Sequence, residues 1–236
     1  MKKPMATTTN ADAREVSVLI VDDETNKSEQ LKRYFLWRNA KNIEYRFIVE
    51  TRRSIAEGVE ALRNGDYDVL ILDVVFPETD KRGLDLALDV HRHLGSKVAL
   101  RILVTAHPRY PDCVEAARAG AWDYLQRTGE GGPQVFEELV VDSALSGLRK
   151  LDFEKEIRDA IHAWLQDREH YAALTRDYLG QIVALWHKPV VRVLAAGKDE
   201  FEVAERLRAW KHEYAWQWPF YHRVTEGDAE MDAVTE

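Results

Sequence analysis

The sequence predicts an α/β fold, in which a doubly wound five-stranded parallel sheet is followed by an all-α C-terminal region. Up to about residue 126, short apolar runs alternate five times with stretches of helical periodicity, which is the pattern of βα units. These runs contain few polar residues, as expected of strands that helices cover on both faces. Beyond residue 133, apolar residues recur at helical spacing, and only helices are expected there.

The expected strands are short apolar runs, and three of them stop at residues that can do chemistry. Residues 18–21 are followed by Asp22 and Asp23, residues 69–72 by Asp73, and residues 98–104 by Thr105; the other two strands are 45–49 and 122–126. Four helices are expected between them, at residues 28–37, 54–63, 84–94 and 112–119. The last two close at Gly95 and Gly120, the residue type that commonly ends a helix.

The C-terminal region is expected to begin with a helix near Pro133, after the glycine-rich loop at 129–132. Further on, five apolar residues spaced by sevens share one seam: Ile157, Trp164, Tyr171, Tyr178 and Leu185. This spacing predicts one long amphipathic helix, or two in line, up to Pro189, and a shorter helix at 199–210. Such a stripe has to be covered, either by the shorter C-terminal helix folding back or by a second subunit. A homodimer or protein-partner interface is expected through these helices.

Length and composition bound the class of protein. The 236 residues are 45% hydrophobic and 31% charged, as in a soluble globular protein. No window holds the roughly 18 apolar residues that a membrane span needs, and no apolar segment follows the N-terminal lysines. Neither a membrane protein nor a secreted one is therefore expected. The single cysteine, Cys113, excludes an internal disulfide and fits a reducing compartment, so a cytoplasmic location is expected.

Four segments are expected along the chain: a disordered tail at 1–14, the sheet domain at 15–150, a helical output or dimerisation region at 151–223, and a disordered acidic tail at 224–236. The net charge of -8 lies in the second part of the chain. Residues 1–128 hold 20 basic and 20 acidic residues, and residues 129–236 hold 13 and 21. Because an acidic region repels polyanions, nucleic acid is not expected as a partner.

Three carboxylates follow the first and third strands, and parallel strands bring their carboxyl ends to the same edge of a sheet. Asp22, Asp23 and Asp73 are hard oxygen ligands, which predicts a Mg²⁺ site at that edge. A carboxylate beside a divalent cation can attack phosphorus and form an aspartyl phosphate. Thr105 and Arg127, which end the fourth and fifth strands, supply the hydroxyl and the cation of a phosphoryl site. No glycine-rich fingerprint follows the first strand, so a dinucleotide fold is disfavoured.

Four motifs in order resemble the receiver domain of bacterial two-component response regulators, the CheY-like domains of flavodoxin-like fold. They are Val-Leu-Ile-Val-Asp-Asp at 18–23, Asp-Val-Val-Phe-Pro at 73–77, Leu-Val-Thr-Ala at 103–106 and Gly-Ala-Trp-Asp-Tyr-Leu-Gln-Arg at 120–127. The resemblance covers about residues 15–150. Two features depart from the family: Arg127 and Thr128 stand where the family has Lys-Pro, and the loop at 77–83 is two residues longer.

The resemblance implies a set of roles at the carboxyl edge of the sheet. These are Asp73 as phosphoacceptor, Asp22, Asp23, Asp73 and the backbone carbonyl of Val75 as Mg²⁺ ligands, Thr105 as switch hydroxyl, Tyr124 as switch aromatic and Arg127 as the cation at the phosphoryl group. It also implies a phosphoryl group received from a histidine kinase or phosphotransfer protein. The chain would be a signalling protein rather than an enzyme, apart from catalysing its own phosphoryl transfer and dephosphorylation.

Two other functions stay open. One is a receiver-like adaptor that works without phosphorylation. The other is a DNA-binding transcriptional regulator, because residues 194–197 and 203–207 are similar to the first half of the helix-turn-helix of many response regulators. The three tryptophans and the proline at 210–219 do not suit a recognition helix in a major groove, which disfavours this second alternative.

Overall fold

The computed structural model describes residues 13–42, 44–76, 82–93, 98–127, 133–188, 190–209 and 219–225. The chain divides into two compact units, Met1–Arg149 and Lys150–Glu236, and each is described here by itself. Within the described residues, no helix has both the length and the apolar character needed to cross a membrane. The expected tails fall almost wholly at 1–12 and 226–236, outside the described residues.

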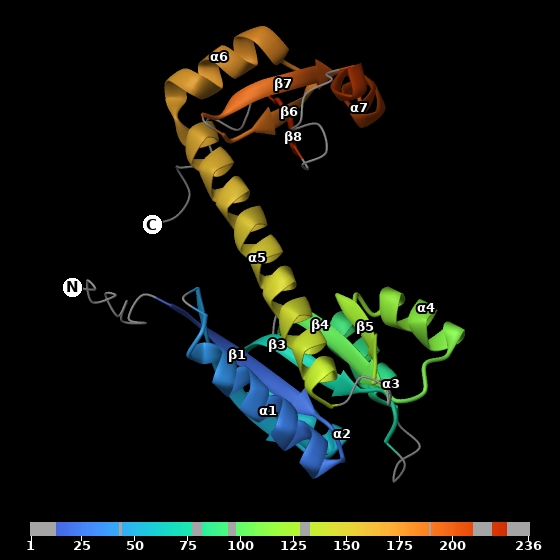
Figure 1. The fold of residues 1–236 in the computed structure, drawn as a ribbon. Helices are drawn as coiled ribbons and strands as arrows, with labels where there is room; N and C mark the ends of the chain where they lie inside the picture. Colours follow the sequence, from blue (N-terminus) through green and yellow to red (C-terminus); the bar gives the residue numbers. More distant parts are fainter. Residues whose placement is uncertain are drawn as a thin grey trace, which may run out of the picture. The chain divides into compact units, whose positions relative to one another are not determined.

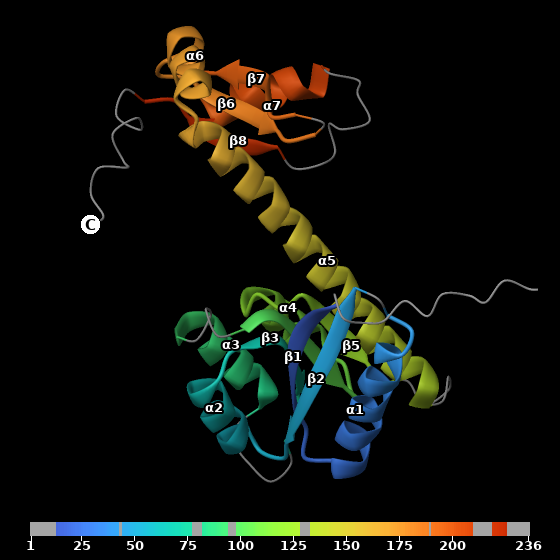
Figure 2. The same ribbon diagram turned by 90° about the vertical axis from the view of Figure 1, so that its left-hand side faces the viewer.

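The N-terminal unit is a five-stranded parallel sheet with helices on both faces, which confirms the predicted α/β fold. Its strand order is β2-β1-β3-β4-β5, and Figure 2 shows α1 and α5 on one side of the sheet and α2 and α3 on the other. The elements are β1 (Arg14–Val21), α1 (Thr25–Asn39), β2 (Tyr45–Arg52), α2 (Ile55–Asn64), β3 (Tyr67–Asp73), α3 (Gly83–His93), β4 (Val98–Thr105), α4 (Tyr110–Arg118), β5 (Asp123–Gln126) and α5 (Pro133–Gln166) (Figure 1).

The central strands are continuous apolar runs because helices cover them on both faces. Every residue from Val18 to Val21 in β1 and from Val69 to Leu72 in β3 is at most 1% exposed. The edge strand β2 instead alternates buried and exposed residues. Chain order reverses between β1 and β3, and ligands of open parallel sheets bind at such a switch point.

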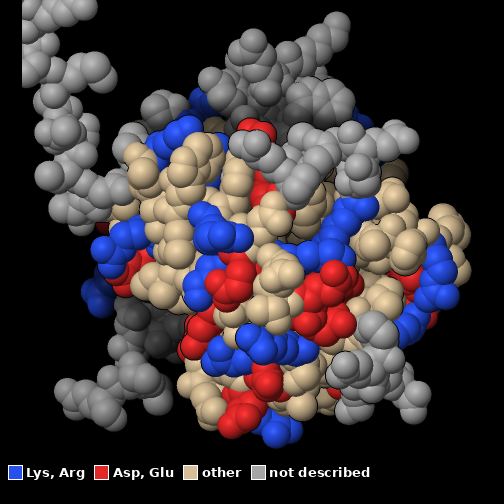
Figure 3. Space-filling model, turned by 60° about the horizontal axis from the view of Figure 1, so that its bottom comes forward, with Lys and Arg blue, Asp and Glu red and all other residues tan. Residues whose placement is uncertain are grey.

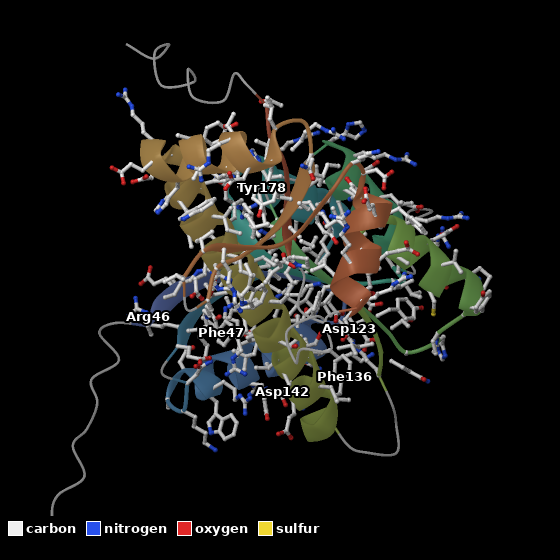
Figure 4. The ribbon with its side chains drawn as sticks, turned by 90° about the horizontal axis from the view of Figure 1, so that it is seen from above. Arg46, Phe47, Asp123, Phe136, Asp142 and Tyr178 are labelled. Carbon is white, nitrogen blue, oxygen red and sulfur yellow. The ribbon has the colours of Figure 1, made fainter. Side chains whose placement is uncertain are left out.

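The first half of α5 is anchored on the N-terminal unit. Its buried side is apolar and consists of Phe136, Val140, Val141, Ala144, Leu145 and Leu148. Arg38 of α1 forms an ion pair of 2.5 Å with Asp142, and the Trp122 indole N–H donates to the Ser143 carbonyl at 3.0 Å. Figure 4 labels Phe136 and Asp142 on these first turns of the helix. The start of α5 is therefore packed as part of the N-terminal unit.

The C-terminal unit contains a small antiparallel sheet, so the predicted all-α C-terminal region is wrong. Its strand order is β7-β6-β8. After the end of α5, the elements are α6 (Arg168–Tyr178), β6 (Ile182–Trp186), β7 (Arg192–Gly197), α7 (Glu200–Ala209) and β8 (Phe220–Arg223). All five residues of β6 are buried, because apolar clusters lie on both faces of this sheet. A short apolar run of this kind reads equally well as a strand or as a buried helix segment.

The seam of residues spaced by sevens is therefore not one helical stripe. Ile157 and Trp164 lie on α5, Tyr171 and Tyr178 on α6, and Leu185 on β6. Residues of the seam pack in one cluster against the sheet of the same unit, so the unit covers this apolar surface itself.

Two further points differ from the sequence analysis. Residues 194–197, which are similar to the first half of a helix-turn-helix in the disfavoured DNA-binding alternative, lie in β7, because their apolar side chains pack in the sheet. The tail was expected to begin at 224, but Val224 is fully buried and its N–H donates to the Gln181 carbonyl at 3.0 Å. The segment 210–218, expected to disfavour a recognition helix, lies outside the described residues.

Candidate functional site

Three polar side chains meet at the carboxyl edge of the central strands. Asp22 directly follows β1, Asp73 is the last residue of β3, and Thr105 is the last residue of β4. Because β1, β3 and β4 are neighbours in the sheet, the sequence-predicted residues are brought together. Asp22 and Thr105 are 0% exposed and Asp73 is 7% exposed. Two acids buried this deeply need hydrogen-bond donors or a cation nearby.

Backbone N–H groups hold each of these side chains. The Glu24 N–H donates to Asp22 Oδ1 at 2.9 Å, the Val75 N–H to Asp73 Oδ1 at 2.9 Å, and the His107 N–H to Thr105 Oγ1 at 3.1 Å. In each case the side chain accepts from a residue two positions later, the local turn that Asp and Thr favour. One oxygen of each carboxylate is thereby fixed, and the other faces the centre of the site.

Arg127 supplies the cation. Its Nη2 donates a short, ion-paired hydrogen bond to Asp22 Oδ2, and its Nη1 lies 3.5 Å from Asp73 Oδ2. The Arg127 N–H donates to the Thr105 carbonyl at 2.7 Å, which places the residue just past β5 beside the end of β4. The side chain is only 11% exposed. The planar guanidinium can span two carboxylates at once, which a lysine ammonium cannot do with the same geometry.

Burial raises the pKa of Asp73 to about 6. The negative charges of Asp22 and Asp23 act in the same direction, while the Val75 N–H and the Arg127 charge oppose them. At neutral pH most of the Asp73 population is ionised, and a desolvated carboxylate is a better nucleophile than a hydrated one.

The donor chemistry of the site suits Mg²⁺, although the side chains are not arranged around a cation. Asp22, Asp23 and Asp73 offer the hard oxygen ligands that Mg²⁺ prefers, and Asp23 is half-buried beside Asp22. Yet no group of three His, Cys, Asp or Glu side chains within the described part of the chain is arranged to hold a metal. The Arg127 guanidinium contacts two of the three carboxylates. A divalent cation would therefore have to displace it.

The predicted switch aromatic, Tyr124, lies on β5 opposite Leu103 of β4, two residues before Thr105. Side chains two apart on a strand share a face of the sheet, so Tyr124 and Thr105 lie on the same face. Burial raises the pKa of Tyr124, and the Asp112 charge at the start of α4 adds to this effect. Asp112 is itself held by Arg109 at 2.8 Å and by Arg82 at 3.2 Å.

Two residues of the site escaped prediction, and both lie in the first turns of α5. The Phe136 ring lies beneath the Arg127 guanidinium, whose Cζ is 5.2 Å from the ring centroid. Glu137 is 5% exposed, burial raises its pKa, and the positive charge of Arg127 opposes that rise. A signal for Glu137 was present in the sequence, because it shares helical spacing with Val140, Val141 and Ala144 on the buried side.

Residues 18–131 match the family model of the response regulator receiver domain. This part of the chain is a response regulator receiver domain. The matched residues contain Asp22, Asp23, Asp73, Thr105 and Arg127, and the C-terminal unit Lys150–Glu236 lies outside them. The predicted resemblance is thereby confirmed, and the chain carries the receiver domain of two-component response regulators.

Solved structures similar to this chain include a receiver domain protein and two response regulators. A CheY-like receiver domain protein from Methanospirillum hungatei JF-1 is 20% identical with a TM-score of 0.46, and the match covers 58% of this chain and 98% of that chain. A two-component response regulator from Clostridium difficile is 16% identical with a TM-score of 0.47 and the same coverage. A response regulator from Thermotoga maritima in complex with Mg²⁺ and BeF is 25% identical with a TM-score of 0.42, over 54% and 98%. No curated protein matches the chain.

Proposed function

We propose that the chain is a two-component response regulator that accepts a phosphoryl group on Asp73 from a histidine kinase or phosphotransfer protein. An ionised Asp73 oxygen attacks the phosphorus of a phosphohistidine, the N–P bond breaks, and the imidazole leaves. Asp22, Asp23, Asp73 and the Val75 carbonyl would hold Mg²⁺, which neutralises charge on the phosphoryl oxygens. Thr105 and Arg127 would contact those oxygens once they arrive.

The observation that carries this proposal is the burial of Asp22, Asp73 and Thr105 together at the switch point of a parallel sheet. Burying two acids side by side destabilises a protein, because the attraction of Arg127 for both of them only partly offsets their desolvation. A purely structural site would be served better by apolar residues of the same size. The arrangement is explained if the acids handle a cation and a phosphoryl group.

Phosphorylation is tested with a small phosphodonor. We expect acetyl phosphate and Mg²⁺ to add one phosphoryl group to the parent chain, seen as a single mass increment by intact-mass spectrometry. Asp73→Asn should take up none. The matched control is Asp89→Asn, which replaces an exposed aspartate of α3 in the same domain and should be phosphorylated like the parent. Phosphate uptake by Asp73→Asn would contradict the assignment.

A second candidate, the phosphorylation-independent adaptor, is favoured by the Arg127 contacts with Asp22 and Asp73, which close the site in this structure. The same experiment separates the two functions. If the parent takes up no phosphate from any donor and binds no beryllofluoride, the adaptor is the better description.

The output is proposed to pass through protein contacts of the C-terminal unit, with a second copy of the chain or another protein. The unit exposes apolar side chains, including Phe201 at 70%, Val190 at 66% and Tyr221 at 40%. DNA is disfavoured by charge, since the net negative charge lies in this half. Figure 3 views the N-terminal unit from below Figure 1, and there too acidic and basic side chains are interspersed.

Sedimentation tests the oligomeric part of this proposal. We expect the parent to sediment above the 27.2 kDa of one chain, because pairing would bury exposed apolar side chains such as Phe201. Phe201→Ser should shift the equilibrium toward the monomer. Glu205→Ser, which changes an exposed polar residue of the same helix, should not. A parent that is monomeric at every concentration would leave only another protein as the partner.

A further inference from the structure

Arg127 makes fewer contacts than its environment allows. Its Nε and Nη1 are buried and donate no hydrogen bond to any described residue, and the contact of Nη1 with Asp73 Oδ2 is a long ion pair of 3.5 Å. Only Nη2 is fully engaged, on Asp22. A buried guanidinium N–H group without an acceptor has lost its hydrogen bonds to water and gained none in the protein. The present position of the side chain is therefore destabilised by this desolvation. A second position of the Arg127 side chain would be favourable if it gave these N–H groups an acceptor.

Glu137, which follows Phe136 on α5, is a buried acid that lacks a partner of its own among the described residues. Only 5% of it is exposed, and its Oε2 accepts no hydrogen bond from any described residue. The Arg127 charge lowers the pKa of Glu137, against the larger effect of burial, which raises it. Phe136, the preceding residue, carries the guanidinium on its ring face. A guanidinium that moves while it stays over the ring of Phe136 keeps its cation–π contact with that ring.

We propose that Arg127 is a two-position switch, which closes over Asp22 and Asp73 in the cation-free site and moves to Glu137 when a divalent cation enters. This inference rests on the proposed Mg²⁺ site. Glu137 is then a positioning residue, which receives Arg127 and lowers the cost of displacing it. The guanidinium and the metal compete for the same two carboxylates, and they cannot both hold them.

The switch links the site directly to α5. In the first position the Arg127 charge pairs with Asp22 and Asp73 at the strand ends. In the second it pairs with Glu137 in the first turns of α5. Phe136 and Glu137 stand on the same helix as Asp142 and Ser143, which tie it to α1 and β5. Occupation of the site therefore changes the charge balance beneath α5. A buried charge pair that can be exchanged is the kind of bistable element that carries a signal.

The experiment is a double-mutant cycle on Mg²⁺ affinity, measured by calorimetry on the full chain without phosphodonor. Arg127→Ala should bind Mg²⁺ about tenfold or more tightly than the parent, because no ion pair has to be broken. Glu137→Gln should bind at least about threefold more weakly, because the displaced guanidinium has lost its second partner. Glu138→Gln is the matched control, since it removes an exposed charge one position along α5 and should match the parent.

The cycle closes with Arg127→Ala/Glu137→Gln. If Glu137 acts through Arg127, its replacement has no effect on Mg²⁺ affinity once Arg127 is absent. An equal effect of Glu137→Gln in both backgrounds, or unchanged affinity in Arg127→Ala, would overturn the switch while leaving the metal site standing. Absence of Mg²⁺ binding in the parent and in all variants would overturn the metal site and the switch together.

Arg127→Ala leaves two buried acids without their cation and could destabilise the fold. A milder variant and a second measurement therefore accompany the cycle. Arg127→Lys keeps the positive charge but not the planar guanidinium that spans two carboxylates. Its Mg²⁺ affinity should lie between those of the parent and Arg127→Ala. A second readout is the Arg127 Nε–H resonance in the parent, assigned by its loss in Arg127→Lys. It should shift on Mg²⁺ addition in the parent, and by a different amount in Glu137→Gln. An identical shift in both proteins would contradict the transfer to Glu137.

Discussion

Gly83→Ala is expected to lower the free energy of unfolding of the receiver domain by about 3 kcal/mol or more. A Cβ at this position would lie 1.7 Å from the Asp73 carbonyl oxygen and 2.8 Å from its carbonyl carbon. Both are backbone atoms, so no side-chain rotation can relieve the clash. Either α3 moves away from the end of β3, or Asp73 itself is displaced. Urea denaturation followed by circular dichroism measures the loss.

The control for Gly83→Ala is Gly65→Ala, where the nearest atom to a new Cβ is 3.6 Å away on the Tyr67 ring. Its backbone φ of -149° is extended, so alanine adopts it without strain. This variant should keep the parent's stability within about 0.5 kcal/mol. Gly83→Ala should also slow phosphorylation of Asp73. If the two alanine variants were equally stable, the close approach of α3 to Asp73 would be refuted.

Asp73→Asn is expected to raise the stability of the metal-free receiver above pH 6, by up to about 3 kcal/mol. Burial raises the pKa of Asp73 to about 6 in the folded protein, against its ordinary value of 3.8. Well below pH 3.8 the group is protonated in both states and contributes no difference. As the pH rises from about 4 to 6, the unfolded chain releases its proton first, so the parent loses stability over this window. The asparagine variant has no proton to release.

The measurement is the unfolding free energy of both proteins from pH 4 to pH 8 in the presence of a chelator. The difference between parent and variant should grow through pH 4 to 6 and then stay level. Groups far from Asp73 titrate alike in both proteins and cancel in this difference. Asp89→Asn serves again as control, because an exposed aspartate should leave the profile of the parent unchanged. A constant difference across the whole range would contradict the raised pKa of Asp73.

The sheet domain could be predicted because its signals are local. A strand segment buried on both faces is a continuous apolar run, as residues 18–21 of β1, 69–72 of β3 and 102–104 of β4 are. The acids at the strand ends then meet because parallel strands end at one edge. The C-terminal unit could not be predicted in the same way. The five residues of β6 carry no alternation, and their neighbours at helical spacing suggested a continuation of the helix.

The amino-acid sequence by itself determined the order of strands and helices up to residue 126 and the identity of the acids, hydroxyl and cation at the carboxyl edge. Those features follow from residue type and from the pattern of apolar residues, both of which can be read within short stretches of the sequence. Only the tertiary structure decided which carboxylates Arg127 contacts and that Glu137 lies within its influence. Which acceptor a side chain binds depends on the distance to it and on the burial of both groups. Both depend on how α5 packs beside the strand ends, and no local sequence pattern encodes that packing.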